Sequence, residues 1–301
     1  MGRVDIPTIF FGGGTPSLMP AVGFEKIINA ISKNFNTPPE CEITLESNPG
    51  TMDRKKLDEF IAAGVNRLSV GVQSLDDEKL KFLGRRHSAA AAIELLRNAA
   101  DRKIRVSADF IYGLPGETTK DIISTCREIN KIGLRHCSMY ELTIEPETVF
   151  GKMNLDMPSD AEMADMYNAI QATLALPRYE ISNYAAPGYE CIHNQNIWAG
   201  APYIGIGQGA AGRPYINNQW YEQRGAGELY QPLSASDRAA EKLITGLRTT
   251  RGIRVTDDIN AILNSEYARR ANNYIQIDNG YIRATKSGML ILDNLLVKLI
   301  K

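Results

Sequence analysis

The residues best suited to chemistry stand where predicted strands end. A short apolar run over residues 8–11 leads directly into Gly12-Gly13-Gly14-Thr15-Pro16. Because glycines lack side chains, their backbone N–H and C=O groups can come within hydrogen-bonding distance of a polar ligand. A simple tight turn between a strand and a helix has the same sequence character. Taken alone, the glycine run is consistent with either a ligand cradle or a turn.

Polar side chains also stand at the ends of later predicted strands. Glu46, Gln73, Asp109 and Glu141 fall late in, or just after, successive strand-like runs. Asp109 interrupts an otherwise apolar run, and a buried carboxylate costs several kcal/mol unless it is paired. A solvated strand end would explain Glu46, and a satisfied turn partner would explain Asp109. The occurrence of all four groups at one end of the strands favours a binding site.

The elements that must position these residues alternate between strand and helix patterns. We expect strands at residues 8–11, 42–46, 67–73, 105–112 and 136–143, and helices at residues 23–34, 53–63, 76–83, 88–102 and 119–132. Thr51 is the expected N-cap of the second helix. Short turns between the elements predict parallel strands with right-handed crossovers. Polar residues at several strand ends favour an incomplete (β/α) barrel over an open doubly wound sheet.

Composition limits the partners and the compartment. The 301 residues are 44% hydrophobic and 23% charged, which is ordinary for a soluble globular protein. A net charge of -1 gives no electrostatic argument for a nucleic acid or an anionic membrane, so we expect no nucleic-acid partner. Apolar runs are shorter than a bilayer span and the first residues lack signal-peptide features. These features predict a cytoplasmic protein.

The four cysteines do not suggest a metal or cluster site. Cys41, Cys126, Cys137 and Cys191 are scattered, and no two share the two- or three-residue spacing of zinc or iron-sulfur ligands. We expect each to be a small buried apolar residue.

Several motifs together resemble a known superfamily. In order along the chain stand FFGGGTPS at 10–17, LESNPG at 45–50, NRLSVGVQS at 66–74, LGR at 83–85 and DFIYGLPG at 109–116. This set resembles the radical S-adenosylmethionine (SAM) enzymes of the oxygen-independent coproporphyrinogen III oxidase superfamily. In the second half, YEISNYA at 179–185, PGYE at 187–190, HNQNIW at 193–198 and YIGIG at 203–207 resemble the HemW heme chaperone branch. The resemblance covers essentially the whole chain.

The resemblance implies a SAM site built from two groups of residues. The backbone of Gly13, Gly14 and Thr15 would contact the methionyl amino end. The ribose and the carboxylate end would be held by Glu46, Gln73, Arg85 and Asp109. These residue types suit the task, because carboxylates accept hydrogen bonds from ribose hydroxyls and arginine grips a carboxylate bidentately.

The chain departs from the family pattern in three places. The family's cluster motif, Cys-x3-Cys-x2-Cys, lies upstream of the glycine turn, and we expect this chain to begin after it, with the first βα unit missing. Without those thiolates the [4Fe-4S] cluster expected for the family has no ligands here, so radical chemistry is not expected. Ala211 stands where the family usually has histidine, and residues 176–178 replace a longer connection.

Heme is the cargo that the resemblance implies, with transfer to an acceptor protein that the sequence does not identify. Any membrane contact would be transient and made through that acceptor. His193 is the best candidate heme ligand, since Trp198 and Tyr203 stand nearby in the sequence for porphyrin stacking. A structural histidine bonded to backbone would explain His193 equally well. We expect structural roles for His87 and His136.

The implied fold class is α/β. It is an incomplete radical-SAM-type (β/α) barrel, TIM-like with its first βα unit missing, followed by a small helical, winged-helix-like C-terminal domain. We expect a partial barrel core at 1–150, a barrel extension with the YEISN and HNxNxW motifs at 151–225, and a HemW-type domain at 226–301. The expected function is heme binding and delivery. An oxygen-independent coproporphyrinogen III oxidase of porphyrin biosynthesis and an inactive truncated fragment are the alternatives.

Overall fold

The chain folds into two compact units. The computed structural model describes residues 3–225, 229–271 and 273–300. Within them, unit 1 comprises residues 3–178 and 182–193, and unit 2 comprises residues 179–181 and 194–300. Residues 151–225, expected as a barrel extension, are therefore shared between the units.

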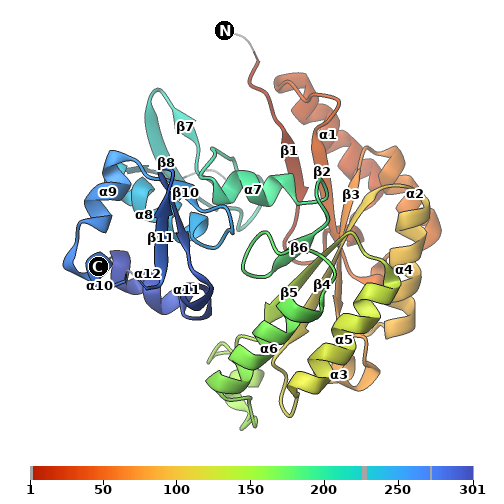
Figure 1. Ribbon diagram of the computed structural model, residues 1–301. Coiled ribbons are helices and arrows are strands. Elements are labelled where there is room, and N and C mark those ends of the chain that lie inside the picture. Colours follow the sequence, from red (N-terminus) through yellow and green to blue (C-terminus); the bar gives the residue numbers. More distant parts are fainter. Residues whose placement is uncertain (1–2, 226–228, 272, 301) are drawn as a thin grey trace. The chain divides into compact units, whose positions relative to one another are not determined.

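Unit 1 is built on a six-stranded sheet in which sequence order equals spatial order (Figure 1). Its strands are β1 (Thr8–Phe11), β2 (Glu42–Ser47), β3 (Arg67–Gln73), β4 (Arg105–Tyr112), β5 (His136–Glu141) and β6 (Asn183–Ala185). The first five run parallel, whereas β6 is antiparallel to β5. The predicted α/β class and the five parallel strands are confirmed. The described strands form an open sheet with β1 and β6 at its edges, and sequence analysis did not predict β6.

Helices connect the strands of the sheet. Those between the parallel strands were predicted, whereas the helix between β5 and β6 was not. The helices are α1 (Ala21–Asn34), α2 (Arg54–Ala62), α3 (Asp77–Phe82), α4 (Ala89–Asp101), α5 (Thr119–Ile132) and α6 (Asp160–Thr173), with short 3-10 turns at Pro16–Leu18, Pro49–Thr51 and Phe150–Lys152. Apolar residues of α4 at helical spacing, such as Leu95 and Ala99, are buried in the core of unit 1. The N-cap prediction for α2 was wrong, because the Asp53 side chain accepts from the backbone N–H of Lys56 while Thr51 ends a 3-10 turn.

Unit 2 contains two small antiparallel sheets and several helices. One sheet joins β7 (Tyr215–Ile216), β8 (Gln219–Arg224) and β9 (Leu229–Leu233), and the other has the order β10 (Ile253–Arg254), β12 (Tyr281–Ala284), β11 (Ile275–Asp278). Asn217 and Asn218, both with positive φ, form the two-residue turn between β7 and β8. The helices are α8 (Ala235–Gly246), α9 (Asp257–Leu263), α10 (Glu266–Arg270), α11 (Lys286–Leu290) and α12 (Leu292–Ile300). The predicted helical, winged-helix-like C-terminal region is confirmed.

Helix α7 (Ile192–Trp198) begins in unit 1 and ends in unit 2. In the part of the chain that the structure describes, no helix combines the length and the apolar character needed to cross a membrane.

Candidate functional site

A pocket of about 470 Å³ lies where the parallel strands of unit 1 end. The glycine turn after β1 and the ends of β2 to β5 all contribute to it, as expected for the ligand site of a (β/α) fold. Of the seven residues predicted to hold SAM, the structure brings six together in the lining: Gly14, Thr15, Glu46, Gln73, Arg85 and Asp109. The seventh, Gly13, is attached to this group, because its backbone N–H donates to Glu46 Oε2 at 3.0 Å.

The glycine turn has two separate requirements. Gly13 and Gly14 adopt φ values of 81° and 59°, a region that L side chains rarely occupy. Gly12 is required for space instead, because an added Cβ would lie 2.7 Å from Phe10 Cε1 and 3.1 Å from Glu46 Oε1. The turn therefore presents its backbone to the pocket while Glu46 lies close beside it.

Glu46 and Asp109 are two of the three carboxylates in the pocket lining, and the third is Glu141 at the end of β5. Asp109 Oδ2 accepts a hydrogen bond of 2.8 Å from Ser69 Oγ. Desolvation raises the pKa of Asp109, and it likewise raises the pKa of Glu46. The Gly13 N–H opposes the shift at Glu46, whereas the charge of Asp109 adds to it. The pair provides acceptors suited to the hydroxyl groups of a sugar.

Gln73 and Arg85 carry unusual features in the same lining. Gln73 has a φ of 68°, at the point where the register between β3 and β4 shifts. A non-glycine residue in this region carries a conformational cost of about 1–3 kcal/mol and marks sites where a special geometry is held. The Nε of Arg85 is buried and has no hydrogen-bond partner among the described residues. A buried guanidinium donor without an acceptor suits an anionic group such as the carboxylate of SAM.

Sequence reasoning did not assign Ser69, Asn48 or Tyr140 to this pocket, which they also line. Ser69 precedes Gln73 by four residues in a predicted strand, so the alternation of side chains along β3 was the available signal.

His193 is held by contacts to β1. Its Nδ1 lies 3.0 Å from Thr8 Oγ1, and its ring stacks on Phe10 with ring centroids 4.8 Å apart. Desolvation lowers the pKa of His193, although the charge of Glu42 opposes this shift. The imidazole is therefore neutral at neutral pH, the form in which histidine binds metals.

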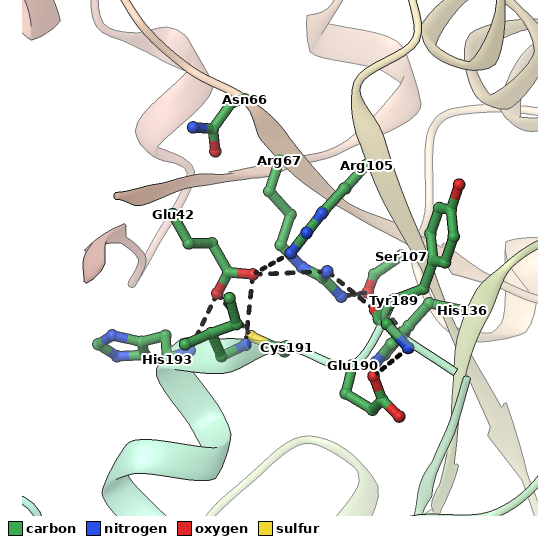
Figure 2. A network of polar contacts seen from close by, with 12 residues as sticks. Glu42, Asn66, Arg67, Arg105, Ser107, His136, Tyr189, Glu190, Cys191 and His193 are labelled. Atoms are coloured by element: carbon green, nitrogen blue, oxygen red, sulfur yellow. Dashed lines mark hydrogen bonds and ion pairs between the residues drawn. The ribbon is translucent and has the colours of Figure 1, made fainter. Parts of the chain in front are cut away.

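Glu42 anchors the start of α7, as Figure 2 shows. The carboxylate, which is 2% exposed, accepts from the backbone N–H groups of Ile192 at 3.2 Å and His193 at 2.9 Å. It also pairs with Arg67 at 3.7 Å and Arg105 at 3.6 Å. A carboxylate at a helix N-terminus satisfies backbone donors that have no partner within the helix. The start of the HNQNIW segment is thus fixed by a buried charge on β2.

The same network continues across the sheet (Figure 2). Arg67 donates to Ser107 Oγ at 2.9 Å and to the Tyr189 carbonyl at 3.1 Å, and Ser107 Oγ lies 2.6 Å from His136 Nδ1. Desolvation and then the charge of Arg67 lower the pKa of His136 well below its usual value. This geometry agrees with the structural role predicted for His136. Sequence analysis missed this network, although β2, β3 and β4 each begin with a charged residue.

The remaining sequence candidates have local partners. His87 Nε2 lies 3.2 Å from the Val72 carbonyl, as expected of a structural histidine. Within unit 2, the ring of Trp198 lies 6.0 Å from that of Tyr179, and Tyr203 pairs through its backbone with Arg213. Ala211 lies close to Gly205, where an added Cβ would come within 2.4 Å of the Ala211 carbonyl oxygen.

The cysteines that the structure describes do not fit a [4Fe-4S] cluster. All four are buried free thiols, and burial raises the pKa of Cys41 to about 11 and that of Cys126 to about 12. Cluster ligands must be thiolates. Over residues 3–225, 229–271 and 273–300, no three His, Cys, Asp or Glu side chains are grouped to hold a metal.

Comparisons with known proteins agree with this fold. The family profile of the radical SAM superfamily matches residues 2–129. The chain is 38% identical to a heme chaperone HemW of Synechocystis sp., over 82% of this chain and 66% of that protein, and 33% identical to the one of Lactococcus lactis, over 82% and 70%. In structure it is similar to the Escherichia coli coproporphyrinogen III oxidase HemN, described as a radical SAM enzyme, with a TM-score of 0.79 and 18% identity over 99% of this chain and 78% of that one.

These findings define a protein of the radical SAM superfamily, for which SAM and a [4Fe-4S] cluster are the implied cofactors. Within that superfamily, the chain belongs to the HemW family. The predicted resemblance is thereby confirmed. Alignments with four of the HemW relatives span 55% to 66% of the relatives' own length.

Proposed function

We propose that this protein binds heme and delivers it to an acceptor protein. The observation that carries the proposal is the environment of His193 in a chain of the HemW family. When Thr8 Oγ1 accepts from Nδ1–H at 3.0 Å, the lone pair stands on Nε2. Among the described residues, Nε2 has no hydrogen-bond partner, so it is available to heme iron. The lowered pKa keeps the ring in its ligating form.

A hemin titration tests this proposal. We expect a saturable shift of the Soret band in the unaltered protein and at least a tenfold weaker affinity in His193→Ala, since one axial ligand is lost. The control is His87→Ala, which removes a second half-buried histidine and should leave hemin binding unchanged. Unsaturable binding, or equal affinity in His193→Ala, would contradict the proposal.

We further propose that the pocket of unit 1 holds SAM. When bound, SAM supplies a sulfonium centre linked to a ribose and a methionyl carboxylate. Glu46 and Asp109 accept hydrogen bonds from the ribose hydroxyls, and Arg85 pairs with the carboxylate. The backbone of Gly13, Gly14 and Thr15 contacts the amino end.

Calorimetric titration with SAM is the direct test of the pocket. Asp109→Ala removes one of the two lining carboxylates that we assign to the ribose, and we expect it to weaken SAM binding by at least tenfold. Unchanged affinity would mean that the pocket keeps the family's shape without its ligand.

The alternative function is that of an oxygen-independent coproporphyrinogen III oxidase, which the fold similarity to HemN makes worth testing. The HNQNIW run favours heme delivery instead. Anaerobic reconstitution with iron and sulfide separates the two, because the oxidase reaction needs a [4Fe-4S] cluster that this chain's cysteines do not fit. A stable cluster absorbance would support the alternative.

A further inference from the structure

Unit 2 contains a second cavity, which neither the SAM pocket nor His193 explains. Its volume is about 160 Å³. It is lined by Ile197 at the end of α7, by Arg213, and by residues of α8 that include Arg238, Lys242 and Ile244. The lining thus combines apolar side chains with several cations.

The charges in this lining are not balanced. Glu241 accepts from Arg213 Nε at 2.8 Å and also pairs with Arg238 Nη1, so both of its oxygens are engaged. Lys242 makes no ion pair with any residue that the structure describes. Arg213 also pairs with Glu222, outside the lining, at 3.5 Å. Arg213 and Arg238 thus have carboxylate partners, and the positive charge of Lys242 is left unbalanced among the described residues.

One donor of the Arg238 guanidinium group lacks a hydrogen-bond acceptor among the described residues. The residue is 6% exposed, its guanidinium lies 4.1 Å over the ring of Trp220, and its Nη2 donates to the Gly200 carbonyl at 3.1 Å. Its buried Nε has no partner among the described residues. Buried polar donors are normally satisfied, so an orphaned one in a cavity wall points to a ligand oxygen.

Lys242 is placed to bind a ligand alongside Arg238. An added Cβ at Gly200 would lie 2.7 Å from Lys242 Cγ, so the absence of a side chain at Gly200 gives the lysine its space. The ammonium of Lys242 lies 5.9 Å from the Trp220 ring that also supports Arg238. The two cations therefore flank one aromatic ring, and both side chains line the cavity.

We propose that this cavity binds a carboxylate group, namely a propionate arm of the porphyrin. This inference rests on the proposed heme function. A cavity of about 160 Å³ is smaller than the roughly 300–1,000 Å³ of pockets that enclose whole ligands, so it accepts an arm and not a macrocycle. Ile197 and Ile244 suit the two methylenes, while Arg238 Nε and Lys242 Nζ bind the oxygens. Ile197 belongs to the HNQNIW run itself.

The test compares hemin with hemin dimethyl ester, whose propionates carry no charge. In the unaltered protein we expect the ester to bind about tenfold more weakly, because a charge-assisted hydrogen bond is lost. Lys242→Gln should remove most of this difference in affinity, because it weakens the binding of hemin and not that of the ester. Lys298→Gln is the matched control, since Lys298 lies exposed on α12 of the same unit and its loss changes the net charge equally. Arg238→Lys should act like Lys242→Gln.

Equal affinity for hemin and its ester in the unaltered protein would overturn the proposal. So would a difference that survives in both Lys242→Gln and Arg238→Lys. Stabilisation of the protein against unfolding by glutarate, a dicarboxylate, provides a second test that does not depend on heme. If hemin shows no saturable binding, the proposed function fails. Glutarate stabilisation that is lost in Lys242→Gln but kept in Lys298→Gln would then assign the cavity to free carboxylates and overturn the porphyrin assignment.

Discussion

At the scale of single residues, Arg85 is the clearest test of the SAM pocket. Its buried Nε lacks an acceptor among the described residues, so a bound carboxylate gains a hydrogen bond to a charged group. Such bonds contribute about 1.5–3 kcal/mol. We therefore predict that Arg85→Gln weakens SAM binding by roughly ten- to hundredfold in calorimetry.

The neighbouring Arg86 provides a matched control for this change. It is exposed, whereas Arg85 is half-buried and lines the pocket. Arg86→Gln removes the same charge one residue away and should leave SAM affinity within twofold. If both variants lose affinity equally, long-range charge and not a contact from Arg85 explains the effect.

Several pocket residues could be predicted from the sequence because they stand at the ends of predicted strands, whereas Arg85 was assigned through the family resemblance. Gly13 and Gly14 follow an apolar strand, and Asp109 interrupts another. Glu42 had no such signal, since a glutamate that alternates with apolar residues at a strand start looks like an ordinary exposed position. Its partners at Ile192 and His193 lie 150 and 151 residues away, and only folding brings them together.

At the scale of elements, Glu42 joins β2 to the start of α7. Replacing it by glutamine leaves the fully buried Arg67 without a counter-charge, and breaking a buried pair in this way costs about 3–5 kcal/mol. We predict that Glu42→Gln destabilises unit 1 by that amount in chemical unfolding. Amide exchange at Ile192 and His193 should also become faster.

Glu40→Gln is the control, because Glu40 is exposed two residues before Glu42. A change at such a surface position is expected to stay within about 0.5 kcal/mol. Equal stability of the two variants would show that the buried pairs contribute little.

The link between β3, β4 and β5 through Arg67, Ser107 and His136 predicts a pH dependence. The pKa of His136 is lowered in the folded state, so below its unfolded value of 6.5 the unfolded chain takes up a proton that the folded chain does not. Stability must therefore fall as pH drops through 6.5, by about 1 kcal/mol between pH 7.0 and 5.5.

Chemical unfolding of the unaltered protein and of His136→Gln at both pH values isolates this contribution. The difference in unfolding free energy between the two proteins should be smaller at pH 5.5 than at pH 7.0, by about 1 kcal/mol. His193, whose pKa is also lowered, acts equally in both proteins and cancels. A constant gap would mean that His136 is protonated in the folded state.

The sequence predicted strands and helices well only where apolar residues recur at a regular spacing. Strands β1 to β5 and their helices follow regular alternation, and β3 and β4 begin and end where predicted. The three-residue strand β6 is too short to carry a period, and its antiparallel pairing with β5 depends on contacts distant in sequence. The meander of β7 to β9 was also missed, although Asn217-Asn218 was a turn signal.

At the scale of the whole molecule, each unit has its own hydrophobic core. Leu68 belongs to the core of unit 1 and Leu243 to that of unit 2, and both are fully buried. Truncation of such a leucine to alanine costs about 2–5 kcal/mol. We predict that Leu243→Ala speeds hydrogen exchange in β11 and β12 while leaving β2 to β4 unchanged.

Leu68→Ala should give the reverse pattern, with faster exchange confined to the strands of unit 1. Together the two variants act as controls for one another, because they remove the same atoms from different cores. Loss of protection throughout the chain in either variant would mean that the units unfold as one.

The anchoring of α7 by Glu42 has a consequence for the order of events during synthesis. The backbone donors at Ile192 and His193 leave the ribosome after about 150 further residues have been added. At roughly 5–20 residues per second, that delay is on the order of 10–30 s. During this interval Glu42 has only its arginine partners, and the unpaired edge of the nascent sheet stays open to other chains. A chaperone that shields nascent chains would therefore be needed most before residue 193 emerges.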